Sequence, residues 1–254
     1  MRSNYLFTSE SVSEGHPDKV ADQISDAVVD LFLSKDPEAR VACETLVTTQ
    51  RIVIGGEIRC KGVYDEELFA DTHGWAPGAR DEIEQVVRQT VRAIGYEQDG
   101  FHWQTADFEN HLHGQSAHIA QGVDAAGHKD EGAGDQGLMF GYACTETPEL
   151  MPMPIMLAHK LVKGLSERRR DSSMDYLRPD GKSQVSIEYD NGRPVRVDTI
   201  VVSTQHSPTV TNETLREDIT EKIVHKVIPK EMMDAKTRIL INPTGRFVVG
   251  GPHG

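Results

Sequence analysis

The stretch Val41-Ala-Cys-Glu-Thr-Leu-Val-Thr-Thr-Gln-Arg-Ile-Val-Ile-Gly-Gly-Glu-Ile-Arg59 decides the fold of the first half of the chain. Residues 41–48 and 52–59 are rich in β-branched side chains, which fit a pleated strand. A short polar segment separates them, as in antiparallel strands joined by a tight turn. The sequence therefore predicts a β-hairpin.

Helices are predicted on both sides of this hairpin. Before it, Pro17 is followed by apolar residues at helical spacing, which indicates a helix over 17–35. After it, residues 81–94 show the same spacing, with acidic residues in the first turn and Gly95 placed to end the helix.

The second half of the chain repeats this order. We predict, in turn, a strand at 138–144, a helix at 154–170, strands at 185–189 and 195–204 joined by Asn191-Gly192, a helix over 215–227 and a strand at 239–242. The doubling predicts an α+β fold of repeated domains with similar topology, each a mostly antiparallel sheet with helices on one face.

A glycine-rich segment at 110–137 separates the two halves and has little periodicity. We expect a long loop. Loops of this length in compact chains are often lids over active sites, and the alternative is a plain linker between domains.

The charge balance excludes some partners. Lys and Arg number 27 against 40 Asp and Glu, giving a formal net charge of -13. A chain this acidic is repelled by nucleic acid and anionic lipid, so any phosphate site must be a local basic cluster. The sequence shows no signal-peptide run and no apolar stretch near the ~20 residues of a membrane span. We expect a cytoplasmic protein with no membrane or nucleic-acid partner.

The start of the first predicted helix is a candidate phosphate site. Free backbone N–H groups and the helix dipole favour an anion there. His16 and Lys19 add positive charge, and Asp18 offers a hard oxygen for Mg²⁺. The alternative is a capped helix with a solvated polar first turn.

Two glutamates, Glu44 and Glu57, lie on the predicted hairpin among apolar or small residues. Facing inward, they must be paired or bind a cation or an ammonium group, because an unpaired buried charge is costly. Facing outward, they are ordinary solvated residues, and the two-residue alternation of a strand allows either.

Charged residues in the second half form two further candidates. Asp180 and Lys182 belong either to a charged turn or to an acid and base pair directed into a cleft. Arg246 beside Phe247, between glycines, suits a phosphate and a flat ring. The glycine-rich run around Asp135 lacks the Gly-Lys-Ser/Thr ending of a phosphate-binding P-loop.

Two other groups have simpler interpretations. We interpret His111, His113 and His118 as solvated loop histidines, because their spacing matches no standard zinc pattern. Arg168-Arg169-Arg170 closes a predicted helix, where cations are favourable.

Seven motifs in register resemble the S-adenosylmethionine synthetase family over nearly the whole chain. They are Gly-His-Pro-Asp-Lys, Ala-Cys-Glu-Thr, Gly-Gly-Glu-Ile, Gln-Gly-Val-Asp, Gly-Ala-Gly-Asp-Gln-Gly-Leu-Met-Phe-Gly-Tyr-Ala, Leu-Arg-Pro-Asp and Asn-Pro-Thr-Gly-Arg-Phe-Val. The resemblance implies attack of the methionine sulfur on C5′ of ATP, followed by hydrolysis of the released triphosphate to pyrophosphate and phosphate. It implies Mg²⁺ and K⁺ as cofactors and self-association as a homodimer or homotetramer.

The resemblance also implies roles for individual residues. His16, with Lys19 beside it, corresponds to the group that stabilises the departing triphosphate, Asp18 to a Mg²⁺ ligand and Glu44 to the K⁺ site. Glu57 and Gln115 correspond to residues that bind methionine. The positions that contact ATP are Asp180, Lys182, Arg246 and Phe247. Asp135 corresponds to a catalytic residue of the substrate site.

The implied organisation is an N-terminal domain at 1–118, a gating loop and connector at 119–137, a central domain at 138–249, and the start of a C-terminal domain at 250–254. Within the loop, Ala117-His118 replaces the family's Pro-Asp, which bears on how the loop closes. Family members continue with a third domain that supplies further ligands, so we expect little activity from these 254 residues alone. The alternative function is a non-catalytic partner subunit of a full-length synthetase.

Overall fold

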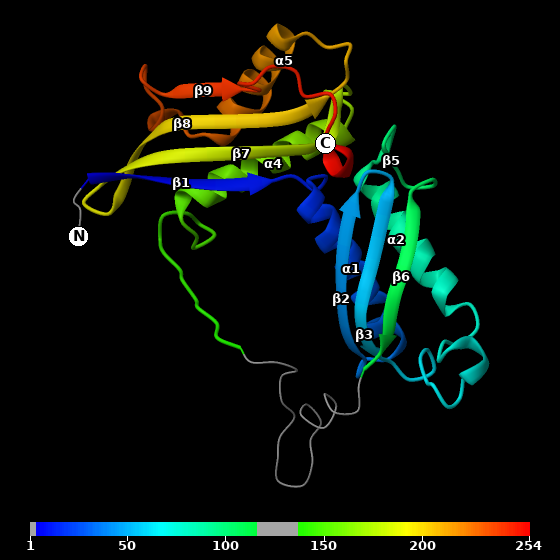
Figure 1. Ribbon diagram of the computed structural model, residues 1–254. Coiled ribbons are helices and arrows are strands. Elements are labelled where there is room, and N and C mark those ends of the chain that lie inside the picture. The colour runs from blue at the N-terminus through cyan, green and yellow to red at the C-terminus, as the bar shows by residue number, and fades with distance from the viewer. Residues whose placement is uncertain (1–3, 116–136) are drawn as a thin grey trace. The chain divides into compact units, whose positions relative to one another are not determined.

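The computed structural model describes residues 4–115 and 137–254 (Figure 1). The chain divides into two compact units. Unit 1 comprises Met1–Lys19 and Tyr142–Gly254, and unit 2 comprises Val20–Gly141. Helix α1 (Pro17–Lys35) therefore begins in unit 1 and continues in unit 2. No helix of the described residues is long and apolar enough to cross a bilayer.

Unit 2 contains a three-stranded sheet in the order β2-β3-β6 (Arg40–Thr48, Arg51–Arg59 and Asp107–Gly114). The predicted hairpin is confirmed: β2 and β3 are antiparallel, while β6 runs parallel to β3. Helix α2 (Ala79–Ile94) ends at Gly95, whose φ of 106° is readily adopted only by glycine. One face of the sheet packs against α1 and α2 around a core that includes Ile24, Ile54 and Val87.

Unit 1 contains a four-stranded sheet in the order β1-β7-β8-β9 (Asn4–Val12, Leu177–Asp190, Arg193–His206 and Arg238–Ile241). All neighbours are antiparallel except β8 and β9, which are parallel. Asn191 and Gly192 both have positive φ at the β7–β8 turn, as the Asn-Gly pair predicts. Helices α4 (Met153–Arg170) and α5 (Asn212–Ile219) contribute Leu161 and Leu215 to the core.

Shorter elements complete the described chain. They are β4 (Glu97–Gln98), β5 (Phe101–His102), α6 (His225–Val227), the π-helical turn Thr220–Val224, and the 3₁₀ turns Ala70–Thr72, Lys230–Met232 and Gly251–His253.

The two units share one topology. Unit 2 runs α1-β2-β3-α2-β6 and unit 1 runs α4-β7-β8-α5-β9; each is a helix, an antiparallel hairpin, a helix and a final strand parallel to the second hairpin strand. Helices cover one face of each sheet because the alternating apolar residues of the strands need a partner surface. The α+β class and the repeated domains are confirmed.

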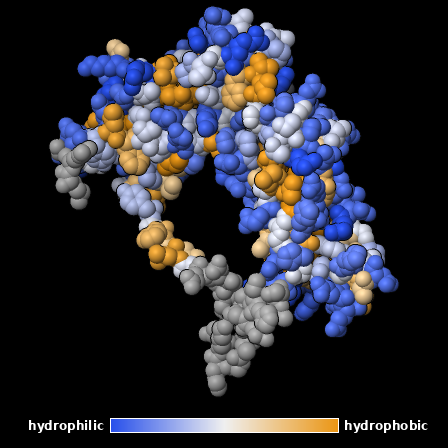
Figure 2. Space-filling model, viewed as in Figure 1, coloured by the Kyte–Doolittle hydropathy of each residue, from blue (hydrophilic) through white to orange (hydrophobic). Residues whose placement is uncertain are grey.

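Three sequence-based predictions are corrected. Residues 138–144 form no strand, because no described neighbouring strand bonds to them. Most of their apolar side chains are exposed, with Phe140 at 90%, and Figure 2 shows hydrophobic residues at the surface of this segment. The expected loop begins later, since Asn110 to Gly114 belong to β6. The helix predicted over 215–227 is interrupted by the π-helical turn. Strand β1 was not predicted, and residues 116–136, with most of the predicted lid, lie outside the described residues.

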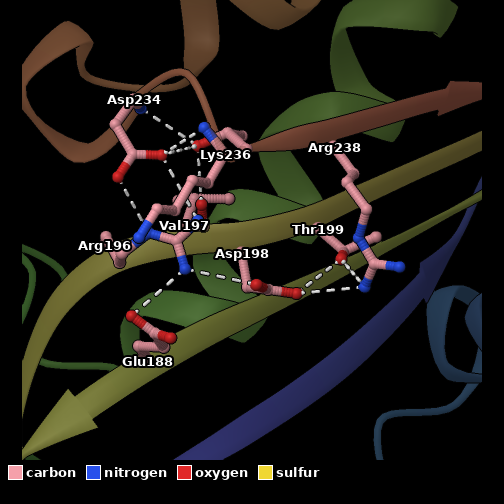
Figure 3. Close-up of polar contacts among 9 residues, drawn as sticks. Glu188, Arg196, Val197, Asp198, Thr199, Asp234, Lys236 and Arg238 are labelled. Atoms are coloured by element: carbon pink, nitrogen blue, oxygen red, sulfur yellow. Dashed lines mark hydrogen bonds and ion pairs between the residues drawn. The ribbon is translucent and has the colours of Figure 1, made fainter.

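An ion-pair network joins three strand segments of unit 1 (Figure 3). Arg196 on β8 contacts Glu188 on β7 at 3.1 Å, Asp198 at 3.2 Å and Asp234, before β9, at 3.2 Å. Arg238 on β9 contacts Asp198 at 3.2 Å. A hydrogen bond from Thr199, then the two arginines, hold the pKa of Asp198 below its usual range. The network therefore stabilises the β7–β8–β9 edge while its carboxylates are ionised.

Replacing Arg196 tests this network. We expect Arg196→Met to lower the urea midpoint of unfolding at pH 7, because it leaves several carboxylates without their shared cation. Folded-state pKa values below the ordinary carboxyl value mean that the stabilisation is present above pH ~4 and is lost as the pH falls through the lowered values. The difference from the wild type should therefore shrink in acid. Arg193→Met, an exposed arginine on the same strand, is the control; an equal effect from it would contradict the account.

Candidate functional site

The turn before α1 is built on the first residues of β7. Ser13 donates its backbone N–H to the Gly181 carbonyl at 2.8 Å and its hydroxyl to the Pro179 carbonyl at 2.7 Å. Gly15 lies so close to Pro179 that a Cβ atom would be 2.4 Å from the Pro179 carbonyl carbon. His16 closes the turn by donating its N–H to the Ser13 carbonyl at 3.1 Å. The contacts of this turn with β7 therefore fix the position of His16.

Glu14 fixes the same turn to the end of α4. Its carboxylate contacts Arg169 Nη2 at 2.6 Å and Arg170 Nη2 at 2.5 Å. Burial alone would raise the pKa of Glu14, but the hydrogen bonds from Arg170 and Arg169 outweigh it and the pKa is lowered. The arginine run that the sequence explained as helix-end cations therefore also holds the turn.

Three candidate residues lie at the start of α1. His16 is partly buried, and its Nδ1 accepts the Asp18 backbone N–H at 3.3 Å. The Asp18 side chain is 83% exposed and Lys19 is exposed as well. First-turn backbone N–H groups of a helix favour an anion. Asp18 and Lys19 are thus exposed at the end of the helix where an anion is favoured.

Asp180 is a buried carboxyl near this turn. It accepts the Gly251 backbone N–H at 2.8 Å. Burial raises the pKa of Asp180 despite the opposing effects of that N–H group and of the His16 charge. Lys182, two residues further along β7, is exposed and pairs with Val12 on β1 in the ladder.

A pocket of about 580 Å³ lies beside the segment after β9. Its lining comprises Ser203, Asn242, Thr244, Arg246, Phe247, Val248 and Val249. The Arg246 guanidinium donates to the Pro208 carbonyl at 2.9 Å. A Cβ atom on Gly250 would lie 2.7 Å from the Phe247 ring and 3.1 Å from Asp180 Oδ2. Asp180 and Phe247 therefore converge on Gly250, where the fold leaves no room for a side chain.

The remaining described candidates lie in unit 2. Glu44 and Glu57 face away from the helices: Glu44 pairs with Gly55, and Glu57 pairs with Ala42 and His113. Glu44 is exposed and Glu57 half-buried. Gln115 donates its N–H to the Ile58 carbonyl at 2.9 Å, and its buried Oε1 has no hydrogen-bond partner among the described residues. A buried acceptor without a partner is a place for a ligand donor.

The structure thus groups most candidates within one unit or the other. Unit 1 carries His16, Asp18, Lys19, Asp180, Lys182, Arg246 and Phe247; unit 2 carries Glu44, Glu57 and Gln115. Asp135 lies outside the described residues. Across the described chain, no three His, Cys, Asp or Glu side chains are arranged to hold a metal on their own. His111 and His113 are exposed, but on β6 rather than in a loop.

Three contributors to this region were not predicted from the sequence: Glu14, Gly250 and His206. The only indication of Gly250 in the sequence is that it belongs to a glycine-rich run. Glu14 and the distant arginines gave no local signal, because their ion pair exists only in the folded chain. His206 stands alone in a strand and matches no motif.

Comparison with known proteins also finds two parts in the chain, but it groups residues 4–19 with the first part, whereas the structure groups them with unit 1. The model of the S-adenosylmethionine synthetase N-terminal domain matches residues 4–117, and that of the central domain matches residues 130–247. S-adenosylmethionine synthases of Rhizorhabdus wittichii, Erythrobacter litoralis and Zymomonas mobilis are 61%, 59% and 57% identical over 257 residues, covering 100% of this chain. The chain belongs to the S-adenosylmethionine synthetase family. It spans 62% of the length of these curated relatives.

Neutralising Asp180 tests how its burial affects stability. Because its folded-state pKa is raised, burial favours the protonated form, and stability decreases as the pH rises through that pKa. We expect Asp180→Asn to raise the melting temperature at pH 7 by about 2–4 °C, the shift that corresponds to 1 kcal/mol at this chain length. The gain should disappear below the ordinary aspartate pKa of ~3.9. Asp175→Asn, an exposed control, should change nothing; a lower melting temperature for Asp180→Asn at pH 7 would contradict the account.

Proposed function

We propose that this chain binds ATP and methionine and takes part in forming S-adenosylmethionine, by attack of the methionine sulfur on C5′ of ATP and subsequent hydrolysis of the triphosphate to pyrophosphate and phosphate. The observation that carries the proposal is the grouping within unit 1: the turn bearing His16, the buried Asp180, and the pocket walled by Arg246 and Phe247. Family membership supports it.

The nucleotide belongs to unit 1 in this proposal. Phe247 offers a flat apolar face to the ring, and Arg246 and Lys182 supply charge for phosphates. His16 stabilises the departing triphosphate, with Lys19 adding charge beside it. Asp180 accepts hydrogen bonds from ATP hydroxyl or amino groups, as its acceptor role toward Gly251 illustrates. The turn at 13–16 and β7 hold His16, Asp180 and Lys182 at fixed positions. Fixed positions raise the rate of a reaction that depends mainly on how the reactants are oriented.

Methionine is assigned to unit 2. The Glu57 carboxylate and the buried Gln115 Oε1 are both hydrogen-bond acceptors, as an ammonium group requires. A thioether carries no proton to remove, so no general base is needed at the attacking sulfur. The chain's contribution is then to orient the sulfur and to stabilise charge on the leaving triphosphate. Asp135 is assigned to the substrate site on the family's motif alone.

Two cations fit the residues present. Mg²⁺ usually takes one or two carboxylates together with phosphate oxygens, and the exposed Asp18 carboxylate beside the proposed phosphate position matches this requirement. The exposed Glu44 carboxylate suits K⁺ as a hard oxygen ligand. Bound Mg²⁺ would neutralise part of the charge on the triphosphate.

We propose homodimeric or homotetrameric self-association as well. Leu6 and Phe7, on the edge strand β1, are 57% and 50% exposed, and Leu138, Met139 and Phe140 are 80–90% exposed. Large apolar side chains in such runs mark an interaction surface, because leaving them in water is costly.

The decisive assay measures S-adenosylmethionine formation with ATP, methionine, Mg²⁺ and K⁺, on a sample whose intact mass is verified. The chain is assayed alone and mixed with a full-length relative, and any increase over the relative alone is recorded. We expect His16→Ala to lower that activity by about 10²–10³-fold, the cost of removing one group that stabilises transition-state charge. His225→Ala, on the surface of unit 1, is the control.

Each outcome is informative. An increase that survives His16→Ala would favour the non-catalytic partner subunit. An absence of any increase, together with no nucleotide binding, would contradict the proposal.

A further inference from the structure

His206, at the end of β8, is a fully buried imidazole that the proposed chemistry does not use. Both ring nitrogens are engaged: Nε2 accepts the Phe247 backbone N–H at 3.1 Å, and Nδ1 lies 2.8 Å from the Ser207 carbonyl oxygen. The His206 backbone N–H also donates to the Phe247 carbonyl at 2.9 Å. One residue therefore holds both backbone polar groups of Phe247.

These contacts fix the tautomer of His206. A neutral imidazole has one donor and one acceptor nitrogen. Because Nε2 accepts the Phe247 N–H, the proton must lie on Nδ1, which donates it to the Ser207 carbonyl. A proton on Nε2 would place two donors against each other. The contact to Phe247 therefore depends on this one arrangement of protons.

Two further hydrogen bonds attach the residues on either side of Phe247 to the end of β8 and the segment that follows it. Gln205 Nε2 donates to the Val248 carbonyl at 2.9 Å, and the Arg246 guanidinium donates to the Pro208 carbonyl at 2.9 Å. Residues 246–248 are thus held along the end of β8, and these three residues line the pocket. The Phe247 ring also lies close to Gly250, where there is no room for a side chain. A shift of the Phe247 backbone would therefore move the ring and change the wall of the pocket.

We propose that His206 is a positioning residue of the nucleotide site: its Nδ1–H tautomer fixes the Phe247 backbone so that the phenyl ring forms the wall against which the nucleotide ring stacks. The identity of the ligand rests on the proposed function, whereas the hold of His206 on the Phe247 backbone rests on the contacts described above. Ring stacking depends on alignment of the two faces, so a small rotation of the phenyl ring is costly.

Two amide substitutions separate the contacts. The amide of asparagine lies the same number of bonds from Cα as Nδ1 does, so His206→Asn keeps the contact to Ser207 but cannot reach Phe247. The amide of glutamine ends where Nε2 does, so His206→Gln keeps an acceptor for the Phe247 N–H. Both amides are polar and similar in size, so each controls for the other.

Three readouts are taken on the whole chain. ¹⁵N NMR of the imidazole should show a protonated Nδ1 and an unprotonated Nε2. Hydrogen exchange of the Phe247 amide should be fast in His206→Asn and slow in the wild type and His206→Gln. Affinity for Mg²⁺ and AMP-PNP should fall about tenfold in His206→Asn, as expected when one buried hydrogen bond is lost, and by less than about threefold in His206→Gln.

The results separate this inference from the proposed function. A protonated Nε2, or equal AMP-PNP affinity in the wild type and His206→Asn, overturns the positioning role while the proposed ATP site stands. If the wild type does not bind AMP-PNP, the proposed ATP site fails. Amide exchange then decides the inference: protection lost only in His206→Asn supports it, and protection kept in both variants overturns it.

Discussion

The contact between Ser13–Gly15 and Pro179–Gly181 is the constraint on which the rest of unit 1 depends. Two hydrogen bonds to β7 carbonyls and a glycine without room for a side chain join a turn near the N-terminus to a strand more than 160 residues later. β1, which pairs with β7 over nine residues, leads directly into that turn. The start of α1 and the buried Asp180 are consequently parts of one unit, although the sequence places them in different halves.

Polar groups are buried or half-buried in this unit where they hold other groups in place. Glu14 is held by two arginines, and His206 uses both ring nitrogens on backbone partners. Asp180 differs, because burial raises its pKa and its ionised form lowers stability. A destabilising ionised group is expected at a site selected for binding rather than for stability. In the proposed function, this contrast distinguishes Glu14, which supports the turn, from Asp180, which is assigned to the nucleotide.

Local patterns predicted the local structure well. The hairpin at 41–59, helix α1 and the Gly95 cap follow from side-chain spacing and glycine conformation, and the repeated order of elements predicted the α+β class. The failures concern non-local partners. β1 and the last part of β6 are strands because other strands bond to them. Residues 138–144 have strand-like composition but no partner strand among the described residues. The site motifs marked His16, Asp180 and Phe247 as candidates, but only the fold revealed Glu14, Gly250 and His206 beside them.

Hydrogen exchange in Gly15→Ala tests most directly whether the turn depends on its close approach to Pro179. The added Cβ atom cannot fit 2.4 Å from the Pro179 carbonyl carbon, so either the turn or β7 must move. Gly141→Ala is the control, because a Cβ atom there meets nothing within 4 Å. We predict faster exchange in peptides covering residues 4–19 and 177–190 of Gly15→Ala, with residues 40–59 unchanged. Exchange in those peptides equal to that of the control would contradict the account.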